Sequence, residues 1–191
     1  MCSIIFYLKE REKVCKLIGD HGTFGEDIIS VMKNILDSGF ILSDKENEWL
    51  GRGIYFFDND AQAKWWGKEQ CKKNKIFKYG IIKAVISYEK ILDLDNLDDR
   101  KKYEEACYEY SKEIAKRKPV FKDKSQAELL IQCLFLSMYK DRNNIDVIKK
   151  TFNLEKKEKQ KYNVLTKTHI QYCVSKEKNI SNKCIHYSSV N

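Results

Sequence analysis

The sequence predicts an α+β fold in one domain, and three observations carry this prediction. Strand-like and helix-like stretches alternate through the first 94 residues, a helical block follows, and strand-like alternation returns near the end. Strands on both sides of a helical block are typical of α+β proteins. At 191 residues the chain can build one domain with a real core but not two ordinary domains. We therefore expect a single domain over 1–191 with a helical insertion at about 95–160.

The first half of the chain contains the clearest periodic patterns. Apolar residues recur at helical spacing from Ile28 to Leu36, and Gly39 supplies a helix stop. Asp58 and Asn59 are cap candidates for a second helix. The predicted elements are a strand at 13–18 that runs into a turn at 21–23, helices at 25–37 and 58–71, a short buried strand at 53–57, and two strands within 79–94.

The second half changes from helical to strand-like texture. The charged stretch 98–118 reads as a helix that Pro119 breaks, and the apolar stretch 125–140 reads as another helix. The basic segment 153–161 is expected to be a solvated loop. Alternating residues then predict strands at 162–165, 169–174 and 184–187. The apolar stretch 2–8 reads poorly as a signal peptide and better as a first strand or helix segment.

Composition limits the class of protein. The 42% hydrophobic content suits a globular fold, and no apolar run approaches the roughly 20 residues of a membrane span, so no membrane partner is expected. The seven cysteines are scattered without zinc-site spacing, which predicts reduced thiols, a cytoplasmic location and no metal. The net charge of +8 permits attraction to nucleic acid or to an anionic cofactor, and suits a Lys-rich surface equally well.

Three short segments carry the chemistry. They read "HGT" at 21–23, "GRGIYFFD" at 51–58 and "IQYCVS" at 170–175. Together they resemble the motifs of the ADP-ribosyltransferase superfamily, in the branch similar to the catalytic domain of poly(ADP-ribose) polymerases. The resemblance covers about 21–94 and 162–187 and leaves the helical insertion unmatched. It implies an ADP-ribosyltransferase-like split antiparallel sheet that binds NAD, as a substrate, in a cleft between the three segments.

Elementary chemistry suits these residues to that role. A glycine at 22 lets backbone groups approach a carboxamide without a side chain in the way. By resemblance, His21 would bind the ribose and Tyr55 would stack on the nicotinamide, with either Trp65 or Trp66 as a second aromatic residue. The tryptophan pair could equally cover the core. The remaining candidates for NAD binding in the motif segments are Thr23, Arg52, which could meet a phosphate or simply be solvated, and Gly53.

Gln171 is the departure from the family pattern. Members that elongate polymers carry a glutamate at this position of the last core strand. An amide can accept a hydrogen bond from a ribose hydroxyl, but it cannot act as a general base. The resemblance therefore implies transfer of a single ADP-ribose, with His21, Tyr55 and Gln171 as the catalytic candidates.

Other carboxylates could replace the missing glutamate. Glu128 lies in "SQAE", a capping box in which Ser125 caps a helix and Glu128 reaches back, so a structural role is expected for it. The other candidates are Glu46, Glu48 and Glu177. The remaining histidines, His169 and His186, lie in alternating strands and are expected to be packing residues.

The expected function is NAD-dependent mono-ADP-ribosylation of a macromolecule, either RNA or DNA or a protein. Basic residues at 156, 157, 159 and 161 make nucleic acid a reasonable acceptor. Small stand-alone domains that resemble this family act as bacterial or phage-type toxins or in antiviral defence, which implies a neutralising antitoxin protein. Two other classes stay open: an NAD glycohydrolase, and a non-catalytic module that binds ADP-ribose or nucleic acid. An RNA 2′-phosphotransferase would need several arginines in the cleft, and Arg52 is the one arginine in a motif.

Overall fold

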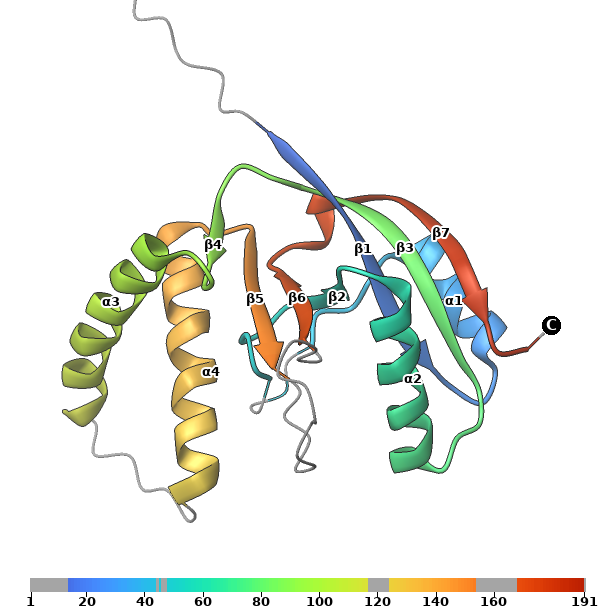
Figure 1. Ribbon diagram of the computed structural model, residues 1–191, viewed down its shortest axis with the longest axis horizontal. Helices are drawn as coiled ribbons and strands as arrows, with labels where there is room; N and C mark the ends of the chain where they lie inside the picture. Colours follow the sequence, from blue (N-terminus) through green and yellow to red (C-terminus); the bar gives the residue numbers. More distant parts are fainter. Residues whose placement is uncertain (1–13, 44, 46–47, 117–123, 154–167, 191) are drawn as a thin grey trace, which may run out of the picture.

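The computed structural model describes residues 14–43, 45, 48–116, 124–153 and 168–190. Its centre is one seven-stranded sheet with the order β4-β5-β6-β2-β1-β3-β7 (Figure 1). Neighbouring strands are antiparallel except for the parallel pair β4 and β5. The strands are β1 (Cys15–Phe24), β2 (Ile54–Phe57), β3 (Tyr79–Tyr88), β4 (Ile91–Asp93), β5 (Val147–Asn153), β6 (Thr168–Val174) and β7 (Ile180–Ser188). This mixture of mostly antiparallel strands and separate helices confirms the α+β class.

Within the described residues, four α-helices cover the sheet. They are α1 (Ile28–Ser38), α2 (Asp60–Asn74), α3 (Leu97–Ala115) and α4 (Lys124–Asn143), and a 3₁₀ turn at Glu177–Asn179 precedes β7. Side-chain caps begin three of the helices: Asp27 accepts from the Ser30 amide, Asn59 from Gln62, and Asn96 from Asp98 and Asp99. Helices α3 and α4 lie together at the β4 end of the sheet, whereas α1 and α2 lie at the β1-β3-β7 end (Figure 1).

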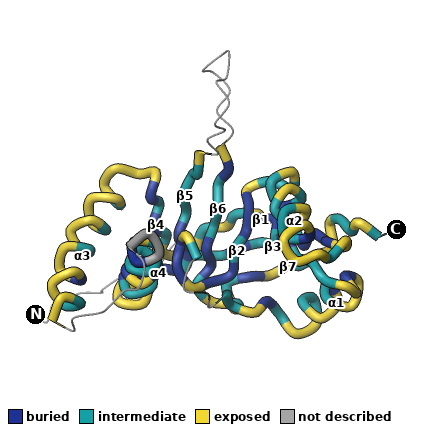
Figure 2. Tube along the Cα trace, turned by 90° about the horizontal axis from the view of Figure 1, so that it is seen from below, coloured by how far each residue is buried: buried dark blue, intermediate teal, exposed yellow. Residues whose placement is uncertain are grey.

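Helices α1 and α2 cover opposite faces of the β1-β3-β7 end. Consecutive residues of a strand point to opposite faces. Ile82 packs in the cluster that contains Ile28 and Met32 of α1, and its neighbour Ile81 packs with Ala63 of α2. The first four residues of β3 are accordingly all buried and drawn dark blue (Figure 2).

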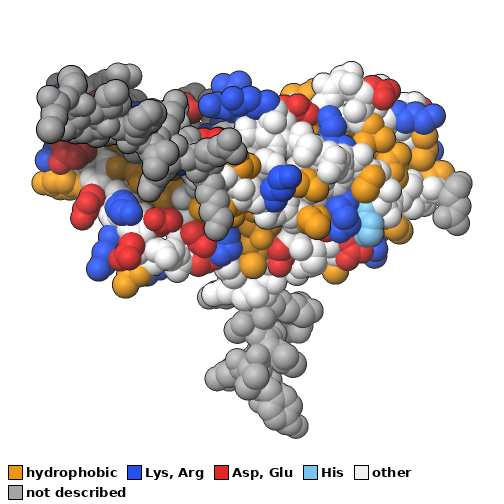
Figure 3. All heavy atoms as spheres, turned by 90° about the horizontal axis from the view of Figure 1, so that it is seen from above, with side chains coloured by type: hydrophobic (Ala, Val, Ile, Leu, Met, Phe, Trp, Pro, Cys, Tyr) orange, Lys and Arg blue, Asp and Glu red, His pale blue; other side chains and the backbone are white. Residues whose placement is uncertain are grey.

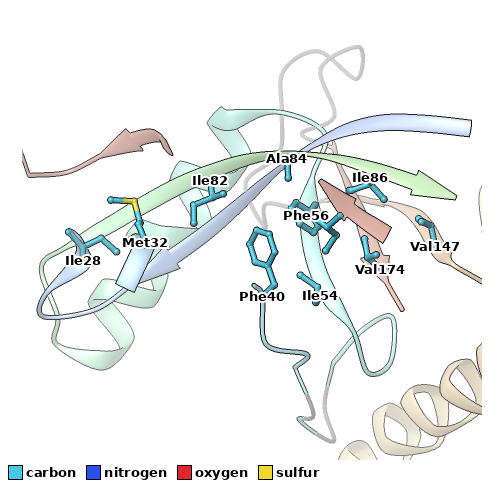
Figure 4. Packing of buried hydrophobic residues seen from close by; sticks show 11 residues of the cluster. Ile28, Met32, Phe40, Ile54, Phe56, Ile82, Ala84, Ile86, Val147 and Val174 are labelled. Atoms are coloured by element: carbon cyan, nitrogen blue, oxygen red, sulfur yellow. The ribbon is translucent and has the colours of Figure 1, made fainter. Parts of the chain in front are cut away.

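Two apolar clusters hold the rest together. The larger surrounds Phe56, which is fully buried and lies 5.2 Å from the ring of Phe40 (Figure 4). The second joins α3 and α4 to the sheet around Leu136 and Ile148, both fully buried. Because Val147 belongs to the first cluster and Ile148 to the second, β5 separates the two cores.

The contact between β1 and β2 is the narrowest in the sheet. Strands β1 and β3 pair continuously from Cys15↔Tyr88 to Phe24↔Tyr79, but β1 and β2 share the single registered pair Asp20↔Phe57. Continuation of that ladder would place Gly22 opposite Tyr55, and no such pair forms between these described residues. The sheet therefore consists of two well-paired parts, β4-β5-β6-β2 and β1-β3-β7, that meet at one point.

Two sequence predictions are wrong. Residues 21–23 do not form a turn, because β1 continues through them to Phe24, supported by its ladder to β3. The predicted insertion at 95–160 is not wholly helical, because β5 lies within it and pairs with β6 from Val147↔Val174 to Asn153↔Thr168. The "VIKKTFN" sequence of β5 alternates poorly, so its strand state comes from pairing with its neighbours.

Most other predicted elements are confirmed within a few residues. The strand predicted at 184–187 is longer and begins at Ile180. Several predictions lie outside the described residues: the segment 2–8, Pro119, the loop at 154–161, the strand at 162–165, the side chain of Ser125, and Glu46. Within the described ranges, no helix combines the length and the apolarity that crossing a bilayer would need.

Candidate functional site

The three motif segments form three adjacent strands at the centre of the sheet. Residues 21–23 lie in β1, residues 54–57 form β2, and residues 170–174 lie in β6, in the order β6-β2-β1. Tyr55 is in register with Cys173, and Phe57 with Gln171. Segments that are more than a hundred residues apart in sequence thus become neighbours.

His21 occupies the gap where β1 and β2 part. Its Nδ1 lies 2.7 Å from the carbonyl oxygen of Tyr55, so the ring donates this hydrogen bond and keeps Nε2 as an acceptor. The ring packs 4.8 Å from Phe40 and 5.5 Å from Phe56, measured between centroids. Burial lowers the pKa of His21 to about 4, against the hydrogen bond to Tyr55, which raises it. The imidazole is therefore neutral at pH 7.

Gly22 permits α2 to pack against β1. A Cβ atom at this position would lie 2.9 Å from Cε3 of Trp66 and 3.0 Å from the carbonyl oxygen of Ala63. The half-buried Trp66 ring also lies 5.9 Å from Phe24. Trp66 is thus the aromatic residue nearest the glycine of the first motif. Thr23 is half-buried and in register with Gly80, at the end of the same strand.

Helix α4 and β6 hold the loop that leads into β2. The buried Lys140 ammonium donates to the carbonyl oxygen of Arg52, and the Ser137 hydroxyl accepts from the Arg52 amide at 3.2 Å. Gly51 has φ +76°, and a side chain there would meet Ser137. A side chain at Gly53 would collide with Cys173. The helical insertion therefore positions the second motif.

The hydroxyl of Tyr55 makes two hydrogen bonds to the loop that precedes β2. The hydroxyl donates to the carbonyl oxygen of Gly51 at 2.6 Å and accepts from the Leu50 amide at 3.0 Å. Burial raises the pKa of Tyr55 far above its usual value. The phenol is consequently protonated and its ring orientation is set by the loop.

A second histidine accompanies Gln171. His169 is only 2% exposed, and its Nε2 lies 2.9 Å from the amide nitrogen of Gln171. Its ring stacks on Phe152 at 5.5 Å and lies near Phe57 and Trp65, at 5.8 and 6.2 Å. Sequence reasoning treated His169 as a packing residue. The signal that it missed is the spacing of two along a strand, which places His169 and Gln171 on one face.

The candidate side chains divide between the two faces of the sheet. Tyr55 and Gln171 share a face, because Tyr55 is in register with Cys173, which lies two residues from Gln171 along β6. His21 pairs with Ile82 of the α1-side cluster, so its ring lies on the opposite face. The structure brings Tyr55, Gln171 and Trp65 to one side, and His21 meets them through the Tyr55 carbonyl.

The alternative carboxylates are distributed around this centre. Glu48 accepts a hydrogen bond from the Ser43 hydroxyl, and Glu177 forms an ion pair with Lys183 at 3.0 Å. Glu128 is exposed on α4. A further carboxylate, Asp20, is 2% exposed, is in register with Phe57, and lies 3.0 Å from the Lys83 ammonium. Sequence reasoning missed Asp20, although it directly precedes the first motif.

A cavity of about 500 Å³ lies beside the Gln171 strand, between α3, α4 and β5. Lys150 lines it and is in register with Gln171. Arg100 and Lys150 contribute positive charge to its wall, and Glu104 and Glu128 contribute negative charge. In the part of the chain that the structure describes, no group of three His, Cys, Asp or Glu residues could hold a metal ion, and six cysteines are free thiols.

Comparison with known proteins gives one relative and no family. No family model matches the sequence, and no solved structure matches it. A stretch of 73 residues is 37% identical to MJ0359 of Methanocaldococcus jannaschii, a protein described as uncharacterized. This stretch makes up 36% of the present chain and 34% of the relative, so the similarity spans about a third of each protein. That description names no activity, substrate or partner.

Proposed function

We propose that this protein is an NAD-dependent mono-ADP-ribosyltransferase whose site lies where β1, β2 and β6 meet. The observation that carries the proposal is the convergence of the three motif segments on three adjacent strands, with the β1–β2 ladder reduced to Asp20↔Phe57. In the proposal, this single-pair junction is the split of an ADP-ribosyltransferase-like sheet. Backbone groups that lack a ladder partner there could bind the nicotinamide carboxamide.

Trp66 is assigned to the nicotinamide and Trp65 to the opposite end of the site. The Trp66 ring lies beside Gly22, whose backbone is the proposed partner of the carboxamide. Trp65 lies near His169 instead and is 43% exposed. The held ring of Tyr55 supplies the second aromatic surface. Aromatic faces on a planar, cationic pyridinium are a favourable combination.

The neutral side chain of Gln171 limits which reactions the proposed site can catalyse. As the bond from the ribose carbon to nicotinamide breaks, its electron pair leaves with nicotinamide and positive charge develops on the ribose. The amide oxygen of Gln171 can accept from a ribose hydroxyl and orient the sugar, but it provides no full negative charge and takes no proton. The acceptor must then attack the ribose carbon and lose its own proton to water or to a base that it brings. Single transfer fits this arrangement better than polymer elongation.

The acceptor in the proposal is a macromolecule, RNA or DNA or a protein. The net charge of +8 favours anionic acceptors. On the face drawn in Figure 3, however, Lys and Arg side chains are scattered among acidic and apolar ones. An acidic protein segment therefore stands beside nucleic acid as a candidate, and a toxin role would add a neutralising antitoxin protein. We place the activity in the cytoplasm, in keeping with the free cysteines.

A second candidate function is binding of ADP-ribose or NAD without transfer. The observation that favours it is the neutral Gln171 at the position of a catalytic carboxylate. An NAD glycohydrolase would use the same site with water as the acceptor. These candidates differ only in the fate of the ribose.

The test measures what happens to the nicotinamide and to the ADP-ribose part of NAD. Purified protein is incubated with NAD labelled in the adenosine part, alone and with RNA, DNA or cell lysate, and both free nicotinamide and macromolecular label are measured. Transfer predicts both signals with one class of acceptor. Release without label indicates hydrolysis, and binding without release indicates the non-catalytic module. His21→Ala, which removes the ring that donates to the Tyr55 carbonyl, should abolish release, whereas His186→Ala, on β7 beside Asp60, is the surface control.

A further inference from the structure

The strongest unexplained feature is the His169–Gln171 pair. Both side chains project from β6, two residues apart, and the distance between the two Nε2 atoms is 2.9 Å. An amide nitrogen only donates, so His169 Nε2 must accept. The ring proton then resides on Nδ1, which is buried and has no hydrogen-bond partner among the described residues.

The surroundings of His169 favour its neutral form. Three aromatic rings enclose it: Phe152 from β5, Phe57 from β2 and Trp65 from α2. Burial lowers its pKa, and the carboxylate of Asp58, at the end of β2, opposes this effect. Lys150 of β5 lies in register with Gln171 rather than with His169. These aromatic rings also fix the plane of the His169 ring, so its Nε2 points in one direction.

We propose that His169 is the positioning residue for Gln171 and fixes which way its amide group faces. By accepting from the amide nitrogen, His169 leaves the Gln171 oxygen as the acceptor for a ribose hydroxyl of NAD. A carboxylate there would place acceptor against acceptor unless the His169 proton moved from Nδ1 to Nε2 or a second proton bound at Nε2. The role in sugar orientation rests on the proposed function, whereas the pairing itself does not.

The pairing is tested by ring ¹⁵N NMR of histidine-labelled protein. The chain has three histidines, so His169 can be assigned by comparison with variants. The expected result is a neutral ring with the proton on Nδ1 from pH 6 to 8. In Gln171→Glu, the ring proton should move to Nε2, or the ring should become an imidazolium, because the new carboxylate only accepts and requires a donor. A wild-type ring with its proton on Nε2, or a Gln171→Glu ring that keeps its single proton on Nδ1 at pH 7, would overturn the proposal.

The positioning role is tested by two substitutions of similar size. His169→Phe keeps a ring on Phe152 but removes the acceptor, and His169→Gln keeps an acceptor at the end of the side chain. We expect His169→Phe to lower kcat for nicotinamide release about 5- to 10-fold, the value of one neutral hydrogen bond, with KM for NAD nearly unchanged. His169→Gln should recover most of that loss. Equal kcat values for His169→Phe and the wild type would sink the positioning role, as would equal losses in both variants.

The NMR and kinetic experiments distinguish failure of the His169–Gln171 pairing from failure of the proposed function. If wild-type protein releases no nicotinamide, the proposed transferase function fails, while the NMR result still decides whether His169 holds the Gln171 amide. Thermal unfolding of both variants checks that each folds.

Discussion

The two parts of the sheet differ in how helices cover them and in the polar side chains that they carry. The β1-β3-β7 part has its longest ladder from Cys15↔Tyr88 to Phe24↔Tyr79 and is covered by α1 on one face and α2 on the other. The β4-β5-β6-β2 part has shorter strands and brings Lys150, His169 and Gln171 together on one face. The difference indicates that one part is a scaffold and the other carries polar chemistry, with His21 between them.

Removal of Phe56 should have the largest effect, because this ring lies in the core that both parts share. Phe56 is fully buried between Phe40 and His21. Phe56→Ala is expected to lower the free energy of unfolding by about 3–5 kcal/mol, measured by chemical denaturation. Ile41→Ala, at a side chain that is 92% exposed, is the control and should change little. A small effect of Phe56→Ala would mean that the two parts do not depend on a common core.

Low pH should lower the free energy of unfolding, because His21 at the β1–β2 junction becomes protonated. The pKa of His21 is lowered to about 4 from its ordinary value of 6.5, so between these two values the unfolded chain binds more protons than the folded protein. Stability from this group is complete above about pH 6.5 and is lost as the pH falls toward 4, by at most about 3 kcal/mol. His21→Asn keeps a donor for Tyr55 without a titrating ring, and its free energy of unfolding should fall less steeply over this range. Parallel pH curves for the two proteins would contradict the prediction.

Gly22→Ala tests the contact between the scaffold and α2. The added methyl group would meet Trp66 and the Ala63 carbonyl, which we expect to cost about 1–3 kcal/mol. In a Trp66→Leu background the same substitution should cost less, because one of the two neighbours is smaller. A double-mutant cycle by thermal unfolding measures the coupling. Purely additive effects would show that Trp66 does not restrict position 22.

The smallest effect is expected where α3 meets α4 at the surface. Arg142 forms a 2.8 Å ion pair with Glu113, and the two side chains are 50% and 40% exposed. Arg142→Ala should therefore cost no more than about 1 kcal/mol, and less at high salt. Leu136→Ala, on the same helix but fully buried, should cost about 2–5 kcal/mol. Comparable costs for the two variants, measured by urea denaturation, would mean that the ion pair and not the apolar contact joins the helices.

Local patterns predicted most of the elements but not their partners. The Ile28 to Leu36 spacing and the Gly39 stop correctly predicted α1, and Asn59 does cap α2. The strand at β5 and the continuation of β1 through His21 were missed, because both depend on ladders to strands distant in sequence. Motif reading likewise selected Tyr55 and Gln171 as candidates but neither His169, which lies beside Gln171 on β6, nor Asp20, which is in register with Phe57.

By itself, the sequence determined the α+β class, the helix boundaries set by periodicity and caps, and the three segments that meet at the centre. These properties depend on residues within a few positions of one another, where spacing and propensity act directly. Only the tertiary structure decided that β1 and β2 share one registered pair, that the His21 and Tyr55 side chains lie on opposite faces, and that His169 holds Gln171. The first two relations arise from the pairing of strands that are distant in sequence, and the third depends on the rings that other strands and α2 pack around His169, so no local pattern alone decides them.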